Sequence, residues 1–167
     1  MNKQILFCRH AEAEPGLFGH SDHDRKLTQN GIQKSKEMAR VLRRNNIYPD
    51  FYISSSARRT LETCKIIKGQ NQDSKVQVFK EIYTDNIDGI ALAISSVGNN
   101  YKVISIFGHN PALNEIYKLI SNNEYLSFPT SGIFIARLDL PNWQDFNIDS
   151  IYLEKYFDPN SIKSYIK

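Results

Sequence analysis

Short apolar runs alternate along this chain with longer segments whose apolar residues recur at helical spacing. The runs have the composition of buried strands and lie at residues 5–8, 51–54, 76–82, 101–107, 133–140 and 151–157. Helical spacing or helix-start signals mark residues 29–45, about 60–68, 90–97 and 111–121. Because strands and helices alternate, we predict an α/β fold with three layers, α/β/α, around a mostly parallel sheet.

The helix predicted at residues 29–45 carries the clearest of these signals. Thr28 can cap its N-terminus, because a hydroxyl before the first turn accepts a hydrogen bond from a free backbone N–H. Ile32, Ala39 and Leu42 share one face, and lysines and arginines fill the opposite face. This pattern predicts a surface helix that packs one side against the sheet.

The composition is that of an ordinary globular protein. The 167 residues are 41% hydrophobic and 23% charged, and no repeat or linker divides them, so we predict a single domain over residues 1–167. A formal net charge of +3 is too small to indicate nucleic-acid binding. Cys8 and Cys64 form neither a metal-like pair nor a disulfide framework, and no apolar run approaches membrane-spanning length. We therefore expect a monomeric cytoplasmic protein that binds neither nucleic acid nor membranes.

Charged residues follow three of the predicted strands. Arg9 and His10 end the first strand, and His109 follows the fourth. Arg58 and Arg59 lie after the second strand, at a helix N-terminus whose free N–H groups also favour an anion. If every strand points the same way, these residues share the edge of the sheet at which ligands bind. Guanidinium groups and imidazoles gathered there predict a phosphoryl-binding pocket, with either Arg58 or Arg59 as a ligand.

These segments resemble the motifs of the histidine phosphatase superfamily, also called phosphoglycerate mutase-like. Residues 9–12 resemble its Arg-His-Gly signature, with Ala11 in place of the usual glycine. Residues 55–63 resemble its Ser-Pro-x-x-Arg-x-x-x-Thr segment, and that register selects Arg59 rather than Arg58 as the ligand. Residues 108–111, Gly-His-Asn-Pro, resemble its second-histidine motif.

Other segments resemble the small SixA-type phosphohistidine phosphatases of that superfamily. Residues 21–31 are similar to their Asp-x-x-Arg-Pro-Leu-Thr-x-x-Gly stretch, with Lys26 in place of the proline. Residues 128–132 and Trp143 also look like that subgroup. The resemblance covers nearly the whole chain, and the combination is specific although each motif alone is weak.

The resemblance implies a mechanism that the residue types support. His10 would attack phosphorus and form a transient phosphohistidine, which water then hydrolyses. Arg9, Arg59 and His109 would bind the phosphoryl oxygens and stabilise the charge of the transition state. Neighbouring cations would disfavour the protonated form of His10, which must be neutral to attack. Neither a metal ion nor another cofactor is required.

The general acid is the point at which the chain departs from the larger members of the superfamily. Those members place a carboxylate after the third strand to protonate an alkoxide leaving group. Here only Asp85 and Asp88 are candidates, and loop solvation or a helix N-cap at Asp88 explains them more simply. SixA-type members lack an obvious acid, and a phosphoramidate needs less proton help than an alkyl phosphate.

The missing acid therefore favours a protein phosphohistidine phosphatase, whose partner would be a phosphohistidine-bearing signalling or carrier protein. The alternative in the same superfamily is a hydrolase of small phosphomonoesters, such as sugar or cofactor phosphates. A catalytically silent phosphate-binding module is a third hypothesis, but it would need only the arginines. The presence of both His10 and His109 favours an enzyme.

Other sites for phosphate chemistry find less support in the sequence. A divalent-metal site could use His20, Asp22, His23 and Asp24, but this loop has no regular geometry and no distant ligand partner. The chain has no Cys-x5-Arg motif, no Asp-x-Asp directly after the first strand and no Gly-Lys-Ser/Thr phosphate loop. These absences exclude cysteine phosphatases, haloacid dehalogenase-type phosphatases and P-loop nucleotide hydrolases.

Overall fold

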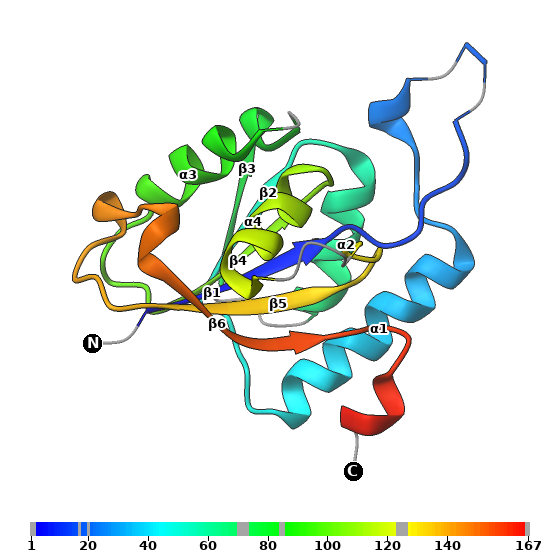
Figure 1. The fold of residues 1–167 in the computed structure, drawn as a ribbon. Coiled ribbons are helices and arrows are strands. Elements are labelled where there is room, and N and C mark those ends of the chain that lie inside the picture. Colours follow the sequence, from blue (N-terminus) through cyan, green and yellow to red (C-terminus); the bar gives the residue numbers. More distant parts are fainter. Residues whose placement is uncertain are drawn as a thin grey trace.

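The fold is organised around one six-stranded sheet with strand order β3-β2-β4-β1-β5-β6 (Figure 1). It is seen in a computed structural model that describes residues 3–16, 18–19, 21–69, 74–83, 86–122 and 127–165. The strands are β1 (Lys3–Arg9), β2 (Phe51–Ser55), β3 (Lys75–Phe79), β4 (Val103–Gly108), β5 (Ile133–Leu138) and β6 (Ile151–Phe157). The helices are α1 (Gln29–Arg44), α2 (Arg58–Lys68), α3 (Ile87–Ser95) and α4 (Ala112–Ser121). Short 3-10 helices are η1 (Asp22–Asp24), η2 (Lys80–Tyr83), η3 (Trp143–Asp145), η4 (Ile148–Ser150) and η5 (Ile162–Tyr165).

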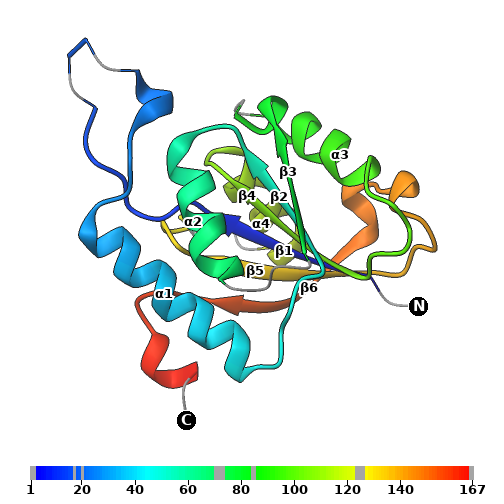
Figure 2. The same cartoon turned by 180° about the vertical axis from the view of Figure 1, so that it is seen from behind.

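Helices cover both faces of the sheet, as the alternating pattern predicted. Helices α1 and α2 lie on the face seen in Figure 2, and their Met38, Leu42 and Ile67 share a buried cluster with Leu6 of β1. Helices α3 and α4 lie on the opposite face, where Ile94 and Leu113 join a second cluster. The sheet residues alternate between these clusters because successive strand side chains point to opposite faces. The prediction of an α/β fold with a mostly parallel sheet is confirmed.

Strand β5 is antiparallel to both of its neighbours, β1 and β6, so the expectation that every strand points the same way is wrong for β5. After α4 the chain passes along the carboxyl end of β1, where Ser131 N donates to His10 O at 3.2 Å and Gly132 O accepts from Arg9 N at 3.1 Å. Strand β5 starts from that end and must run back along β1. Between β5 and β6 there are only short 3-10 turns, whereas a parallel pair would need a longer crossover.

Two helix starts differ in how well the sequence predicted them. The Thr28 cap of α1 is confirmed, because its Oγ1 accepts from Gly31 N at 3.0 Å. The cap of α3 is Asn86 rather than Asp88, and its Oδ1 accepts from the backbone N–H groups of Asp88 and Gly89 at 2.9 and 3.3 Å. Asp88 is therefore the second residue of α3, and its backbone N–H is one of the groups that the cap satisfies.

The third strand is shorter than predicted and gives way to η2. Strand β3 ends at Phe79, and residues 80–83 turn into a 3-10 helix that buries Ile82. The apolar alternation continues through this turn, which is why the sequence could not separate the strand from the 3-10 helix. Cys8 and Cys64 are free and buried, as the absence of a disulfide framework predicted. Within the described residues, none of the helices has the length and apolar character needed to cross a membrane.

Gly31 offers a test of how closely α1 packs on the chain that follows β1. A Cβ at this position would overlap the backbone carbonyl of Glu12, which also accepts a hydrogen bond from Thr28 N at 3.0 Å. In an open helix Gly→Ala stabilises by about 1 kcal/mol. Here we expect overpacking to outweigh that gain, so that Gly31→Ala lowers the free energy of unfolding in urea by about 1 kcal/mol or more.

The matched control for this substitution is Gly16→Ala, because nothing lies within 4 Å of a Cβ at Gly16. It should change stability by less than about 0.5 kcal/mol. A Gly31→Ala protein as stable as the wild type would show that α1 can move away from Glu12 without cost.

Candidate active site

A cavity of about 450 Å³ opens at the carboxyl ends of β1, β2 and β4. It is lined by Arg9, His10, Asp22, Arg25, Arg59, Tyr83, His109 and Asn110. The structure thus brings together all four residues that the sequence assigned to a phosphoryl site: Arg9, His10, Arg59 and His109. They converge because parallel strands deliver the residues that follow them to one edge of the sheet.

One ring nitrogen of His10 is hydrogen-bonded to the backbone, and the other faces a residue that lines the cavity. Its Nδ1 lies 2.7 Å from the carbonyl oxygen of Ala11, and since a carbonyl only accepts, Nδ1 carries the proton and donates. Its Nε2 therefore has a free lone pair, which accepts from Arg59 Nε at 3.3 Å. Burial lowers the pKa of His10 to about 4, and the charges of Arg59 and Arg9 act in the same direction. The imidazole is neutral at pH 7 and presents a nucleophilic lone pair.

Arg59 is the central cation of the site. It lies in the first turn of α2 with its side chain only 7% exposed, and its Nη1 donates to the backbone oxygen of Asp22 at 2.8 Å. Its Nη2 donates to Asp22 Oδ2 at 3.1 Å and faces His109 Nδ1 at 3.4 Å. Every nitrogen of this guanidinium therefore faces another residue of the cavity.

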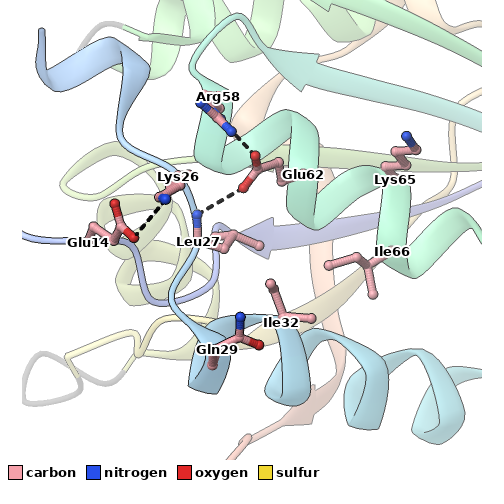
Figure 3. Close-up of a pocket in the computed structure, with 9 residues that line it drawn as sticks. All are labelled: Glu14, Lys26, Leu27, Gln29, Ile32, Arg58, Glu62, Lys65 and Ile66. Carbon is pink, nitrogen blue, oxygen red and sulfur yellow. Dashed lines mark hydrogen bonds and ion pairs between the residues drawn. The ribbon is translucent and has the colours of Figure 1, made fainter.

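The neighbouring Arg58 points elsewhere, since consecutive helix residues are separated by about 100°. Its side chain is 53% exposed and forms an ion pair with Glu62 at 2.8 Å. Figure 3 shows this pair in a different cavity, between α1 and α2. The geometry thus places Arg59, and not Arg58, with the histidines.

His109 is also neutral, a point that the sequence left open. Arg59 Nη2 can only donate, so the Nδ1 of His109 accepts, and its Nε2 carries the proton and donates to Ser55 Oγ at 2.9 Å. Burial lowers the pKa of His109 to about 3, and the charges of His10 and Arg59 add to the effect. The two imidazole rings lie 5.1 Å apart between centroids.

Arg9 is fixed by the turn that precedes β5. Its Nη1 donates to the carbonyl oxygen of Phe128 at 2.6 Å, and Asn110 Nδ2 donates to the same oxygen at 3.0 Å. Within the described part of the chain, the buried Nε of Arg9 has no hydrogen-bond partner. Burial leaves the charge of Arg9 less well solvated than usual, and this lowers the pKa of Arg9. An anion in the cavity would relieve that cost.

Four lining residues were not assigned to the site from the sequence: Asp22, Arg25, Tyr83 and Asn110. Asp22 and Arg25 belong to the SixA-like stretch at residues 21–31, and Asn110 follows His109 in its motif, so a signal for each was present. Tyr83 had no such signal, because its place depends on where β3 ends and η2 turns.

Of the two candidate acids, the structure describes only Asp88. Asp88 is exposed in the first turn of α3 and does not line the cavity. Asp85 lies outside the described residues, as does His20 of the alternative metal site. In the described ranges no three His, Cys, Asp or Glu side chains are grouped so as to hold a metal ion. His23 instead lies with its Nε2 3.0 Å from Ser56 Oγ.

Residues 5–93 match the histidine phosphatase superfamily (branch 1), which is more than half of the chain, and the chain belongs to this superfamily. The sequence-based assignment to that family, and with it to a class of phosphatases, is confirmed at this level.

The chain is also similar in fold to solved structures and in sequence to a plant protein. A candidate phosphohistidine phosphatase SixA from Agrobacterium tumefaciens superposes with a TM-score of 0.79 at 20% identity, covering 94% of this chain and 98% of that one. The protein histidine phosphatase SixA complexed with tungstate gives 0.76 at 19% identity, covering 95% and 99%. An uncharacterized chloroplastic protein of Arabidopsis thaliana is 25% identical over 131 residues, which are 72% of this chain but only 60% of that protein.

The two neutral histidines should make stability depend on pH. In the folded protein the pKa values of His10 and His109 are about 4 and about 3, against 6.5 for an ordinary histidine. Below pH 6.5 the unfolded chain therefore binds more protons than the folded one, so stability falls as the pH falls towards 4. We expect a loss on the order of 2 kcal/mol per histidine between pH 7 and pH 4 in urea unfolding.

The double variant His10→Asn His109→Asn is the control for this dependence. It removes both titrating rings and should flatten the curve between pH 7 and pH 4, although other acid-sensitive groups remain. A variant whose stability falls as steeply as that of the wild type would show that other groups cause the acid sensitivity.

Proposed function

We propose that this protein is a phosphatase that transfers a phosphoryl group to His10 and then to water, and that its substrate is a phosphohistidine on another protein. The observation that carries the proposal is the neutral His10, whose Nε2 lone pair faces a cavity lined by Arg9, Arg59 and His109. A buried neutral nucleophile beside fixed cations is the arrangement that attack on an anionic phosphoryl group requires.

In the first step the Nε2 lone pair of His10 attacks phosphorus in line with the leaving group. Arg9 and Arg59 bind the equatorial oxygens and stabilise the charge of a loose transition state. Arg59 can turn from the Asp22 carboxylate towards the phosphoryl group. The Nδ1 of His109 carries no proton in the structure, so His109 can donate to a phosphoryl oxygen only once its ring takes up a proton, which a bound dianion would favour. Water then hydrolyses the phosphohistidine on His10.

The leaving group is the second half of the reaction, and a phosphorylated nitrogen suits this cavity best. Among the described residues, the carboxylate that lines the cavity is Asp22, which two arginines and Tyr83 hold in its charged form. A charged carboxylate cannot protonate an alkoxide, so the described part of the cavity offers alkyl phosphates no carboxylic acid. The fold likeness to proteins named as phosphohistidine phosphatases supports the same substrate class.

The proposal is tested by comparing three substrates in the presence of EDTA: a phosphohistidine-bearing protein, an aryl phosphate and an alkyl phosphate. We expect activity without metal and a kcat/KM that falls steeply as the leaving group becomes more basic. The physical reason is that none of the described cavity residues is a carboxylic acid that could protonate a poor leaving group.

A fast alkyl phosphate reaction that collapses in Asp85→Asn would contradict the proposal and identify a small-molecule phosphomonoester hydrolase. Turnover that is lost in EDTA and restored by a divalent ion would instead revive the metal site at His20 and His23. No turnover of any of the three substrates, with phosphate still bound, would indicate the silent binding module.

The adjacent arginines of α2 test the phosphoryl site itself. Arg59→Ala should lower kcat/KM on the order of 10²-fold or more, because it removes a buried cation from the transition state. Arg58→Ala is the matched control and should change kcat/KM little, since Arg58 lies in the other cavity and pairs with Glu62. Equal losses in both variants would refute the assignment of Arg59.

A further inference from the structure

Asp22 places a negative charge in a cavity that otherwise gathers cations. Its side chain, 56% exposed, lies in η1 and reaches Arg59 Nη2 at 3.1 Å and Arg25 Nε at 2.8 Å. Tyr83 Oη donates to the same carboxylate at 2.7 Å. A carboxylate here weakens the binding of a phosphoryl dianion, because like charges repel across a cavity of this size. The role of Asp22 in the cavity is therefore something other than binding the phosphoryl group.

The loop that carries Asp22 is anchored to the rest of the fold. At its base Glu14 N donates to Lys26 O at 2.9 Å, and Leu27 N donates to Glu62 Oε2 at 2.8 Å. Figure 3 shows the second of these bonds, together with the Lys26–Glu14 ion pair at 3.4 Å. Asp22 is thus held at the cavity both by the base of the loop and by the side chains that bind its carboxylate.

Asp22 is also poorly suited to donating a proton. The hydrogen bond from Tyr83 lowers its pKa, and the charges of Arg59 and Arg25 lower it further. The carboxylate remains ionised at neutral pH and can attract a cation but cannot act as a general acid. If the arginines bind the phosphoryl oxygens, the part of the substrate that can meet Asp22 is its leaving group.

We propose that Asp22 is a specificity-determining residue that selects substrates whose leaving imidazole is protonated on the ring nitrogen not bonded to phosphorus, namely the N-phosphoryl imidazolium form of phosphohistidine. This inference rests on the proposed function and names the ionic form of its substrate. A phosphorylated imidazole is neutral or cationic on its ring, and a neighbouring carboxylate favours the cation.

The chemistry of the step explains why the cation matters. The lone pair of His10 Nε2 forms the new N–P bond while the P–N bond of the substrate breaks. The electron pair of the broken bond stays on the substrate nitrogen, so an imidazolium departs as a neutral imidazole. The unprotonated form would have to depart as an imidazolide anion, which is a much poorer leaving group. Asp22 thus raises the fraction of bound substrate that can react.

The test compares Asp22→Asn with wild type on two substrates, N-phosphoimidazole and p-nitrophenyl phosphate. An opposite charge within about 4–6 Å shifts a pKa by a unit or more, so kcat/KM for N-phosphoimidazole should fall about tenfold. For p-nitrophenyl phosphate, which carries no leaving cation, kcat/KM should rise because a repulsive charge is removed. The alkaline limb of the kcat profile with N-phosphoimidazole should move to lower pH, since the bound imidazolium loses its partner.

Other ionisable groups do not mimic this pattern. Arg25, Arg59 and Tyr83 face Asp22 directly, with Arg9, His10 and His109 lining the rest of the cavity. They act on both substrates, so a change in their titration would alter both rates together. Asp24→Asn is the matched control: it removes the same charge from η1, but Asp24 does not line this cavity, and both rates should stay unchanged.

Each outcome decides the inference. Equal losses on both substrates would show a structural role for Asp22, and a larger loss with an alkyl phosphate would show that it donates a proton after all. If Asp22→Asn does not fold, Asp22→Ser removes the same charge and carries the same expectations. The proposed function is judged separately, by the substrate preference of the wild type, whereas this inference is judged by the ratio of variant to wild type.

Discussion

The hydrogen bond from His10 Nδ1 to the carbonyl of Ala11 is the interaction on which the chemistry of this site depends. It fixes the tautomer, so that Nε2 is the nitrogen with the lone pair, and it fixes the plane of the ring. The backbone of His10 is itself held on both sides, to Gly108 of β4 and to Ser131 before β5. Without this support a buried imidazole beside two arginines could turn its N–H towards the cavity and lose the nucleophilic role proposed for it.

Burial and positive charge act together on this ring. Removing an imidazole from water disfavours its protonated form, and nearby guanidinium groups disfavour it again. The same cations are themselves partly desolvated, as the lowered pKa of Arg9 indicates. These partly desolvated cations are therefore costly for the fold, and a dianion bound beside them would offset that cost. Affinity and reactivity have one physical origin.

The sequence predicted those features that local pattern determines. Apolar runs gave the strands, and the residues that follow them gave Arg9, His10 and His109, because strand direction alone carries these residues to one edge of the sheet. The choice of Arg59 over Arg58 required the family register, since a helix start does not show which of two arginines faces inward. Tyr83 could not be predicted, because its position depends on a strand ending after Phe79 and on tertiary packing of Ile82. The reversal of β5 likewise follows from a long-range contact with β1.

The base of the loop between β1 and α1 divides the site into two parts of different origin. Ala13 and Leu27 form a bridge across this base, which closes the loop independently of what lies between them. The groups assigned to the phosphoryl moiety reside on the sheet and on α2, whereas Asp22 and Arg25 reside inside the closed loop. Closed surface loops tolerate changes in length and sequence at little cost. The loop residues proposed to face the leaving group can therefore change while the residues on the sheet and on α2 stay the same. Proteins that share one phosphoryl-binding site can in this way act on different substrates through changes in this single loop.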